Sequence, residues 1–144
     1  MKKETKHYVV AVLTYKRYEM FKKQTHKFLL KRKVPPDKIY VFVADEDEKL
    51  KYEEVLEEGT YKEIIVGVPG AAQQREFISD YFDEGQFIVY ADDDCKDLTE
   101  MVDKKSSTRV GNVDAFIRYM FSELIKNNLY IWGVSAVDNP FFMN

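Results

Sequence analysis

The sequence predicts an α/β fold in three layers, in which helices cover both faces of a mainly parallel sheet. Continuous apolar runs, such as YVVAVLTY at Tyr8–Tyr15 and IYVFVA at Ile39–Ala44, are typical of strands that are buried on both faces. Segments with helical spacing of apolar residues lie between these runs, as the crossovers of parallel strands require. Because 144 residues is a common size for one domain, we expect a single domain over residues 1–144.

The elements are expected to alternate along the chain. The predicted strands are Tyr8–Tyr15, Ile39–Ala44, Ile64–Val68, Phe87–Ala91 and Leu129–Val134. The predicted helices are Tyr18–Arg32, a segment with Leu50, Val55 and Leu56 inward that ends at Gly59, a segment between Gly70 and Gly85, and a segment capped by Asn112. The polar stretch Lys104–Thr108 is expected to be an ordered loop or a mobile lid.

Composition excludes several classes of protein. Hydrophobic residues make up 45% and charged residues 33%, which is not the composition of a disordered chain. The single cysteine, Cys95, excludes an internal disulfide framework and a multi-cysteine zinc site. The net charge of −3 gives no overall attraction to nucleic acid or anionic lipid. No apolar run reaches the roughly 18 residues of a membrane span, so we expect a cytoplasmic protein without membrane contact.

Residues whose side chains could bind a ligand directly follow the predicted strands. In an open parallel sheet, ligands bind beyond the carboxyl ends of the strands, where these residues should converge. The rim residues are Thr14, Tyr15, Lys16 and Arg17 after the first strand, Asp45 and Glu46 after the second, Gly67, Pro69 and Gly70 after the third, and Asp92, Asp93 and Asp94 after the fourth.

The three consecutive aspartates predict a metal site. Like charges repel at the end of a buried strand, and a bound cation would relieve that repulsion. Alternation places Asp92 and Asp94 on one side and Asp93 on the other, so two carboxylates are available to Mn²⁺ or Mg²⁺ beside water and phosphate. The alternative is that these acids cap a helix or lie in solvent. An EF-hand is excluded because Asp97 occupies the position that requires glycine.

Other rim residues have two interpretations each. Arg75, near the start of the third helix, is either a contact for an anionic phosphate or an exposed helix arginine. Asp45 either binds a base or ribose or favours the first turn of a helix. Both the P-loop and GxGxxG motifs are missing.

The C-terminal aromatic segment also has two interpretations. Trp132, Gly133 and the loop Asn139–Met143 either face an acceptor or form core or dimer contacts. The two histidines, His7 and His26, are expected at the surface, without a ligand role.

Several motifs together resemble the nucleotide-sugar-binding half of a GT-A glycosyltransferase, whose Asp-x-Asp motif ends the fourth strand. Within that group, the chain is similar to viral and DNA-modification-associated glycosyltransferases over nearly its whole length. The segments that carry the resemblance are LTYKR at 13–17, VFVADE at 41–46, IIVGVPGAAQQREFI at 64–78, VYADDD at 89–94 and YIWGVSAVDNPFFM at 130–143.

The resemblance implies metal-dependent transfer of a sugar from a UDP-type nucleotide sugar to a hydroxyl acceptor, either a modified DNA base or a glycan. The resemblance implies a donor site in which Thr14, Tyr15 and Arg17 contact the base and diphosphate, Asp45 contacts the uracil or ribose, and Arg75 contacts the donor. It implies that Asp92 and Asp93 contact the sugar and that Asp92 and Asp94 bind Mn²⁺ or Mg²⁺. Trp132, Gly133 and Asn139 are implied on the acceptor side. A viral protein in the cytoplasm of its host fits the same resemblance.

The family continues past this point into an acceptor-binding part, whereas this chain stops at Asn144. Because the catalytic base of inverting members comes from that part, no base is assigned, and Asp138 is a candidate. Three alternatives remain: a minimal enzyme, a product completed by a partner chain or second subunit, and a nucleotide-sugar-binding or assembly module without turnover. A magnesium-dependent phosphatase or nucleotidyltransferase is the rival enzyme class, since clustered aspartates also serve phosphoryl transfer.

Overall fold

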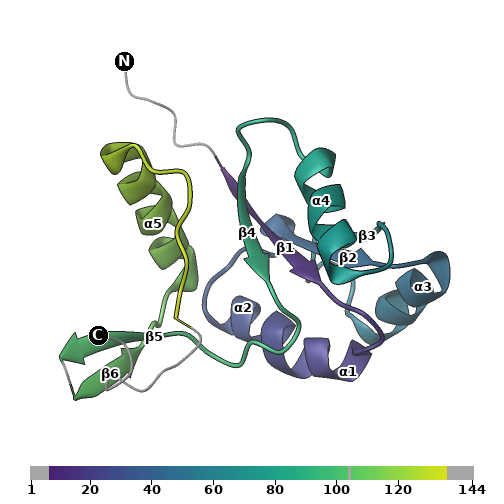
Figure 1. The fold of residues 1–144 in the computed structure, drawn as a ribbon. Helices are drawn as coiled ribbons and strands as arrows, with labels where there is room; N and C mark the ends of the chain where they lie inside the picture. The colour runs from purple at the N-terminus through teal and green to yellow at the C-terminus, as the bar shows by residue number, and fades with distance from the viewer. Residues whose placement is uncertain (1–6, 104, 136–144) are drawn as a thin grey trace. The chain divides into compact units, whose positions relative to one another are not determined.

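The computed structural model describes residues 7–103 and 105–135. The chain divides after Lys96 into two compact units, and each is described by itself. The elements of the first unit are β1 (Tyr8–Leu13), α1 (Tyr18–Phe21), the π-helical turn η1 (Lys22–His26), α2 (Lys27–Lys31), the 3₁₀ turn η2 (Pro36–Lys38), β2 (Ile39–Val43), α3 (Glu46–Val55), β3 (Glu63–Val66), α4 (Ala71–Tyr81) and β4 (Phe87–Ala91) (Figure 1).

The first unit contains a four-stranded parallel sheet in the order β3-β2-β1-β4. Its register pairs Val12 of β1 with Val41 of β2 on one side and with Ala91 of β4 on the other. All four strands were predicted from apolar runs, which the central strands β1 and β2 need because they are buried on both faces. The α/β class with a parallel sheet flanked by helices is therefore confirmed.

Helices cover both faces of this sheet. Val10, Ala11 and Val12 are consecutive in β1 and have no exposed surface, so neither face of the strand is open to solvent. The chain passes from β1 to β2 and β3 in one direction and returns across the sheet to β4. Right-handed crossovers then place α1–α2 and α3 on one face and α4 on the other (Figure 1). On the α4 side, Ile78 packs in a core cluster with Phe42.

Two helices differ from the sequence prediction. The helix predicted over Tyr18–Arg32 contains the π-helical turn η1, and regular α-helix resumes at Lys27. In α3, Leu50 was expected to face the core, yet it is 57% exposed, whereas Glu48 and Tyr52 are buried. The prediction was wrong there because apolar periodicity gives no weight to a buried carboxylate. The helix also ends at Val55, four residues before Gly59.

The second unit contains β5 (Thr99–Asp103), β6 (Ser106–Arg109) and α5 (Val113–Asn127). Strands β5 and β6 form an antiparallel hairpin, so the prediction of a loop or lid over Lys104–Thr108 is wrong for its strand residues. At the turn, Asp103 Oδ1 accepts hydrogen bonds from the backbone N–H groups of Lys105 and Ser106, at 2.7 and 3.0 Å. A short polar hairpin of this kind has no apolar pattern that sequence reasoning could detect.

The cap of α5 is confirmed, since Asn112 Oδ1 accepts from the backbone N–H of Ala115 at 2.9 Å. The predicted fifth strand at Leu129–Val134 is wrong, because this segment has no strand structure. Its Trp132 instead packs edge-on against Phe116 and Phe121 of α5, with ring centroids 5.9 and 5.6 Å away. Within the described ranges, no helix is both long enough and apolar enough to span a bilayer.

Candidate functional site

The sheet has a switch point between β1 and β4. The chain leaves β1 toward β2 on one side, and β4 is added later on the other side, so the order of the strands reverses between β1 and β4. In open α/β sheets, ligands bind beyond the carboxyl ends of the strands at such a point. Thr14 follows β1 and Asp92 follows β4, and the register that pairs Val12 with Ala91 brings these two rim segments together.

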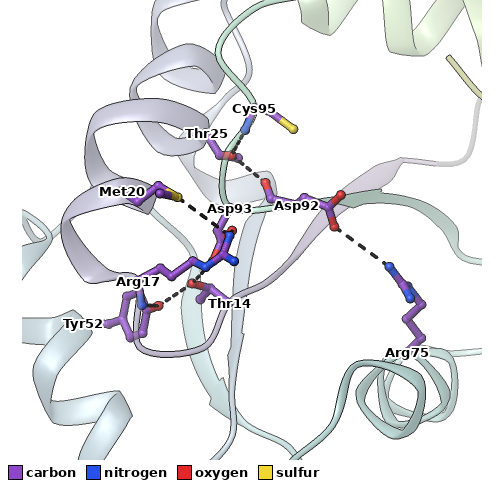
Figure 2. A network of polar contacts seen from close by, with 9 residues as sticks. All are labelled: Thr14, Arg17, Met20, Thr25, Tyr52, Arg75, Asp92, Asp93 and Cys95. Carbon is purple, nitrogen blue, oxygen red and sulfur yellow. Dashed lines mark hydrogen bonds and ion pairs between the residues drawn. The ribbon is translucent and has the colours of Figure 1, made fainter. Parts of the chain in front are cut away.

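A buried hydrogen-bond chain joins three elements at this point (Figure 2). The Thr14 hydroxyl donates to Asp93 Oδ2 at 2.9 Å. Because that hydroxyl carries only one hydrogen, the short hydrogen bond between Thr14 and the Tyr52 hydroxyl must be donated by Tyr52. Burial raises the pKa of Tyr52 to about 12, which keeps this donor protonated at neutral pH. The end of β1, the helix α3 and the loop after β4 are therefore locked together.

Asp93 also orients an arginine at the rim. Its Oδ1 lies 3.2 Å from Nη1 of Arg17, so each carboxylate oxygen has a protein partner. Asp93 is only 6% exposed, whereas Asp92 and Asp94 on either side of it are exposed. This separation does not follow from strand alternation, because β4 ends at Ala91 and Asp93 and Asp94 lie in a turn. Asp93 holds the rim together, and Asp92 and Asp94 face outward.

The loop that carries the aspartates is fixed through its backbone. The hydroxyl of Thr25, in η1, donates to the carbonyl oxygen of Asp92 at 2.5 Å and accepts from the N–H of Cys95 at 2.8 Å (Figure 2). Thr25 has no exposed surface. Cys95 is half-buried, and this burial raises the pKa of its thiol, so it is not a thiolate at neutral pH.

A second buried carboxylate ties the ends of β1 and β2. Glu48 Oε1 accepts from the backbone N–H of Lys16 at 2.7 Å, and Oε2 accepts from that of Ala44 at 3.0 Å. Asp45 caps α3 in the same region, where its Oδ1 accepts from the N–H of Glu48 at 2.9 Å. The structure therefore gives Asp45 the helix-start role that sequence analysis weighed against base or ribose binding.

The loop after β3 is held by a buried glutamine. The side-chain amide of Gln74 accepts from the N–H of Val68 at 2.9 Å and donates to the carbonyl of Val43 at 3.0 Å. A Cβ atom at Gly67 would lie 1.9 Å from Gln74 Oε1, so a side chain there would push the Gln74 amide out of its present position. Gly70 has φ +91° and precedes α4, where a side chain would be strained. These contacts set the start of α4 relative to β2.

Three side chains at the rim remain available to a ligand. Arg17 and Arg75 are each about half exposed, and Arg75 Nη2 lies 4.0 Å from Asp92 Oδ1 (Figure 2). Tyr15 is 57% exposed, with the Lys16 ammonium 5.2 Å from its ring centroid. Guanidinium groups and an exposed aromatic ring are the kinds of side chain that contact anionic groups and planar rings.

The side chains that could act as metal ligands determine which ions the site could bind. Among the described residues, no three His, Cys, Asp or Glu side chains gather as a cation cage. Asp92 and Asp94 nevertheless supply two outward carboxylates. Magnesium and manganese are commonly held by one or two carboxylates, with waters and substrate phosphates completing the shell. Two carboxylates are the number with which such an ion is commonly held, and the described residues contain no group of three or more that could hold it alone.

The residues predicted on the acceptor side lie in the second unit or beyond the described chain. Trp132 packs on α5. Gly133 is exposed, and a Cβ atom there would meet no heavy atom within 4 Å. Asn139 and the base candidate Asp138 lie outside the described residues.

Sequence reasoning missed the buried polar residues that build the rim: Thr25, Glu48, Tyr52 and Gln74. The spacing of Glu48, Tyr52 and Leu56, four residues apart, is the signal that could have identified the inward face of α3. His26 was expected at the surface, yet it is 5% exposed and its Nε2 lies 2.8 Å from the carbonyl oxygen of Thr60.

Comparisons of this chain with protein-family models, with curated proteins and with solved structures give no match.

Proposed function

We propose that this chain is a metal-dependent glycosyltransferase of the GT-A type, which takes a sugar from a UDP-type donor. The observation that carries the proposal is the pair of exposed carboxylates, Asp92 and Asp94, after β4 at the switch point of the sheet, with Arg75 near Asp92 and Arg17 paired with the intervening Asp93. Carboxylates alone would repel a diphosphate. Two nearby guanidinium groups and a divalent ion would reverse that repulsion.

In the proposed site, Asp92 and Asp94 hold Mn²⁺ or Mg²⁺. Tyr15 offers its exposed ring to the uracil, and Arg17 and Arg75 contact the diphosphate. Thr14 and Asp93 act as positioning residues, because their side chains are already engaged with each other and with Arg17. This assignment refines the expectation that Thr14 and Asp93 contact the donor directly.

The reaction breaks the bond between the anomeric carbon and the diphosphate oxygen. The electron pair of that bond leaves with UDP, the acceptor oxygen bonds to the anomeric carbon, and the acceptor hydroxyl releases its proton. The bound ion would stabilise negative charge on the leaving diphosphate. Arg17 would stabilise the same charge by hydrogen bonding, and Asp93 keeps its guanidinium in place.

Calorimetric titration of the chain with UDP and Mn²⁺ tests the donor half of this proposal. We expect wild-type binding to require the metal and Asp94→Asn to weaken it by about tenfold or more, because one carboxylate ligand is lost. Asp83→Asn is the matched control, since Asp83 is also an exposed aspartate but precedes β4 at the amino end of the sheet. Absence of wild-type binding, or equal binding by Asp94→Asn, would contradict the proposal.

Turnover is measured separately. Incubation with UDP-glucose and Mn²⁺ should release UDP, and mass spectrometry of hydroxymethylated DNA and glycan acceptors should detect the added hexose. Release of phosphate from an aryl phosphate without any sugar transfer would instead assign the site to phosphoryl chemistry.

A further inference from the structure

A basic hollow lies on the first unit, away from the aspartate loop. It has a volume of about 650 Å³ and lies between the helical segment η1–α2 and the residues that follow α3. Lysines line one side, Leu30 and Leu56 provide apolar surface within it, and Glu57 and Thr60 belong to the other side. The basic residues of the hollow, together with the one histidine, are Lys22, Lys23, Lys27, Lys31 and His26.

The positive charge of this segment contrasts with the chain as a whole. The run KKQTHKFLLKRK from Lys22 to Lys33 has six lysines and arginines and no acid, whereas the whole chain has a net charge of −3. Lys22, Lys27 and Lys31 are exposed, and none of them has a salt bridge to any residue that the structure describes. Burial lowers the pKa of His26, so the lysines provide the charge at neutral pH.

The lysines form a row along the helix. The steps of five residues from Lys22 to Lys27 and of four residues from Lys27 to Lys31 correspond to about 7.5 and about 6 Å at the usual helical rise. A row of flexible point charges suits a ligand with repeated negative charges, since lysine contacts phosphate without a fixed planar geometry. Among the described residues, no Phe, Tyr or Trp lines the hollow, so those residues offer no large aromatic platform for stacking bases.

From this arrangement we propose that the hollow binds the phosphodiester backbone of a nucleic acid, by charge and without reading its sequence. A membrane surface fits less well, because interfacial helices bury an apolar face in lipid. The apolar face of this helix is already used, since Phe21 and Leu29 are buried in the protein core. Nucleic-acid binding at the hollow does not depend on the proposed sugar transfer, because neither Asp92 nor Asp94 is among the described residues that line the hollow.

Fluorescence anisotropy with a labelled oligothymidine and with a duplex of the same length tests the proposal on the full chain. If three phosphates are neutralised, log affinity should fall with log salt concentration with a slope of about −2 for the single strand. The triple variant Lys22→Gln, Lys27→Gln and Lys31→Gln should lose that slope, and its affinity should fall by about tenfold or more. The corresponding lysine-to-arginine variant should retain binding, because it retains the charge.

The matched control removes the same charge elsewhere, through Lys51→Gln, Lys105→Gln and Lys126→Gln, which are all exposed lysines outside the hollow. It should bind like the wild type. Equal loss in both triple variants, or no loss in the first, would overturn the proposal. Binding to phosphatidylserine vesicles without binding to either nucleic acid would overturn it in favour of a membrane. UDP and Mn²⁺ binding should be unchanged in both variants, which separates this proposal from the glycosyltransferase proposal.

Discussion

Thr14 connects the end of β1 to two other elements through a single hydroxyl group. It accepts from Tyr52 of α3 and donates to Asp93 after β4, and all three side chains are buried. A buried polar group that loses its partner keeps the full cost of desolvation. Removal of the Thr14 hydroxyl would leave Tyr52 and Asp93 without this hydrogen-bond partner, so we expect this hydroxyl to stabilise the folded chain.

Thr14→Val removes the hydroxyl and keeps the shape of the side chain. We expect the free energy of unfolding to fall by about 1–3 kcal/mol, because Tyr52 loses its acceptor and Asp93 loses a donor. Chemical denaturation measures this difference. Thr14→Ser retains the hydroxyl and serves as the control. Equal destabilisation by Val and Ser would show that the methyl group matters and that the hydrogen bonds do not.

His26 is a second residue whose burial has a measurable consequence. Its Nε2–H donates to the carbonyl oxygen of Thr60, and desolvation lowers its pKa below the ordinary 6.5. The unfolded chain consequently binds a proton at a higher pH than the folded chain does. Stability contributed by neutral His26 is therefore present above pH 6.5 and decreases as pH falls from there toward the folded-state pKa.

His26→Gln should have a weaker dependence of stability on pH than the wild type. The glutamine amide can still donate to Thr60, but it does not titrate. Denaturation curves between about pH 7.5 and about pH 5.5 measure the free energy of unfolding across the relevant range. His7→Gln, which removes an exposed histidine, is the control. Identical pH dependence in wild type and His26→Gln would contradict a neutral, buried His26.

At the scale of elements, the π-helical turn η1 connects the helix layer to the aspartate loop. Such turns are rare and occur frequently at functional sites. Here the turn contains Thr25, whose hydroxyl holds both the carbonyl of Asp92 and the N–H of Cys95. The outward placement of Asp92 and Asp94 therefore depends on a helix that lies far from them in the sequence.

Thr25→Val should release this loop while leaving the packing volume unchanged. We expect the amide hydrogen of Cys95 to exchange about tenfold faster or more, because it loses its acceptor. Hydrogen exchange followed by NMR measures the rate, and Thr25→Ser should preserve the protection. If the Cys95 amide exchanges at the same rate in Thr25→Val, the loop is held by something other than this hydroxyl.

The predictability of each element depends on how its residues are buried. The central strands β1 and β2 were predictable because burial on both faces requires an unbroken apolar run, and the edge strands β3 and β4 have apolar runs although they are less buried. The same rule produced a false strand at Leu129–Val134, where apolar residues follow a helix and Trp132 packs on that helix. The β5–β6 hairpin has only Met101 and Val102 as apolar residues, and its turn depends on Asp103, so apolar periodicity could not reveal it.

At the scale of the whole molecule, the order of the strands determines where a site can form. The return of the chain across the sheet to β4 creates the switch point, and it brings Arg17 and Asp93 together although they are 76 positions apart. Sequence reasoning could predict this convergence from the rule that ligands bind at the carboxyl ends of parallel strands. It could not predict Tyr52 or Thr25, because their roles depend on inward helix faces whose hydrogen-bond partners lie on other elements.

The central claim is that a divalent ion binds at Asp92 and Asp94 together with a diphosphate. Paramagnetic broadening by Mn²⁺ in NMR spectra of the labelled chain with UDP tests its location directly. We predict that broadening is strongest for the amide signals of residues 14–17 and 92–95 and that Asp94→Asn abolishes it. Broadening centred on the acidic helix α3, or spread evenly over the acidic residues of the chain, would contradict the claim.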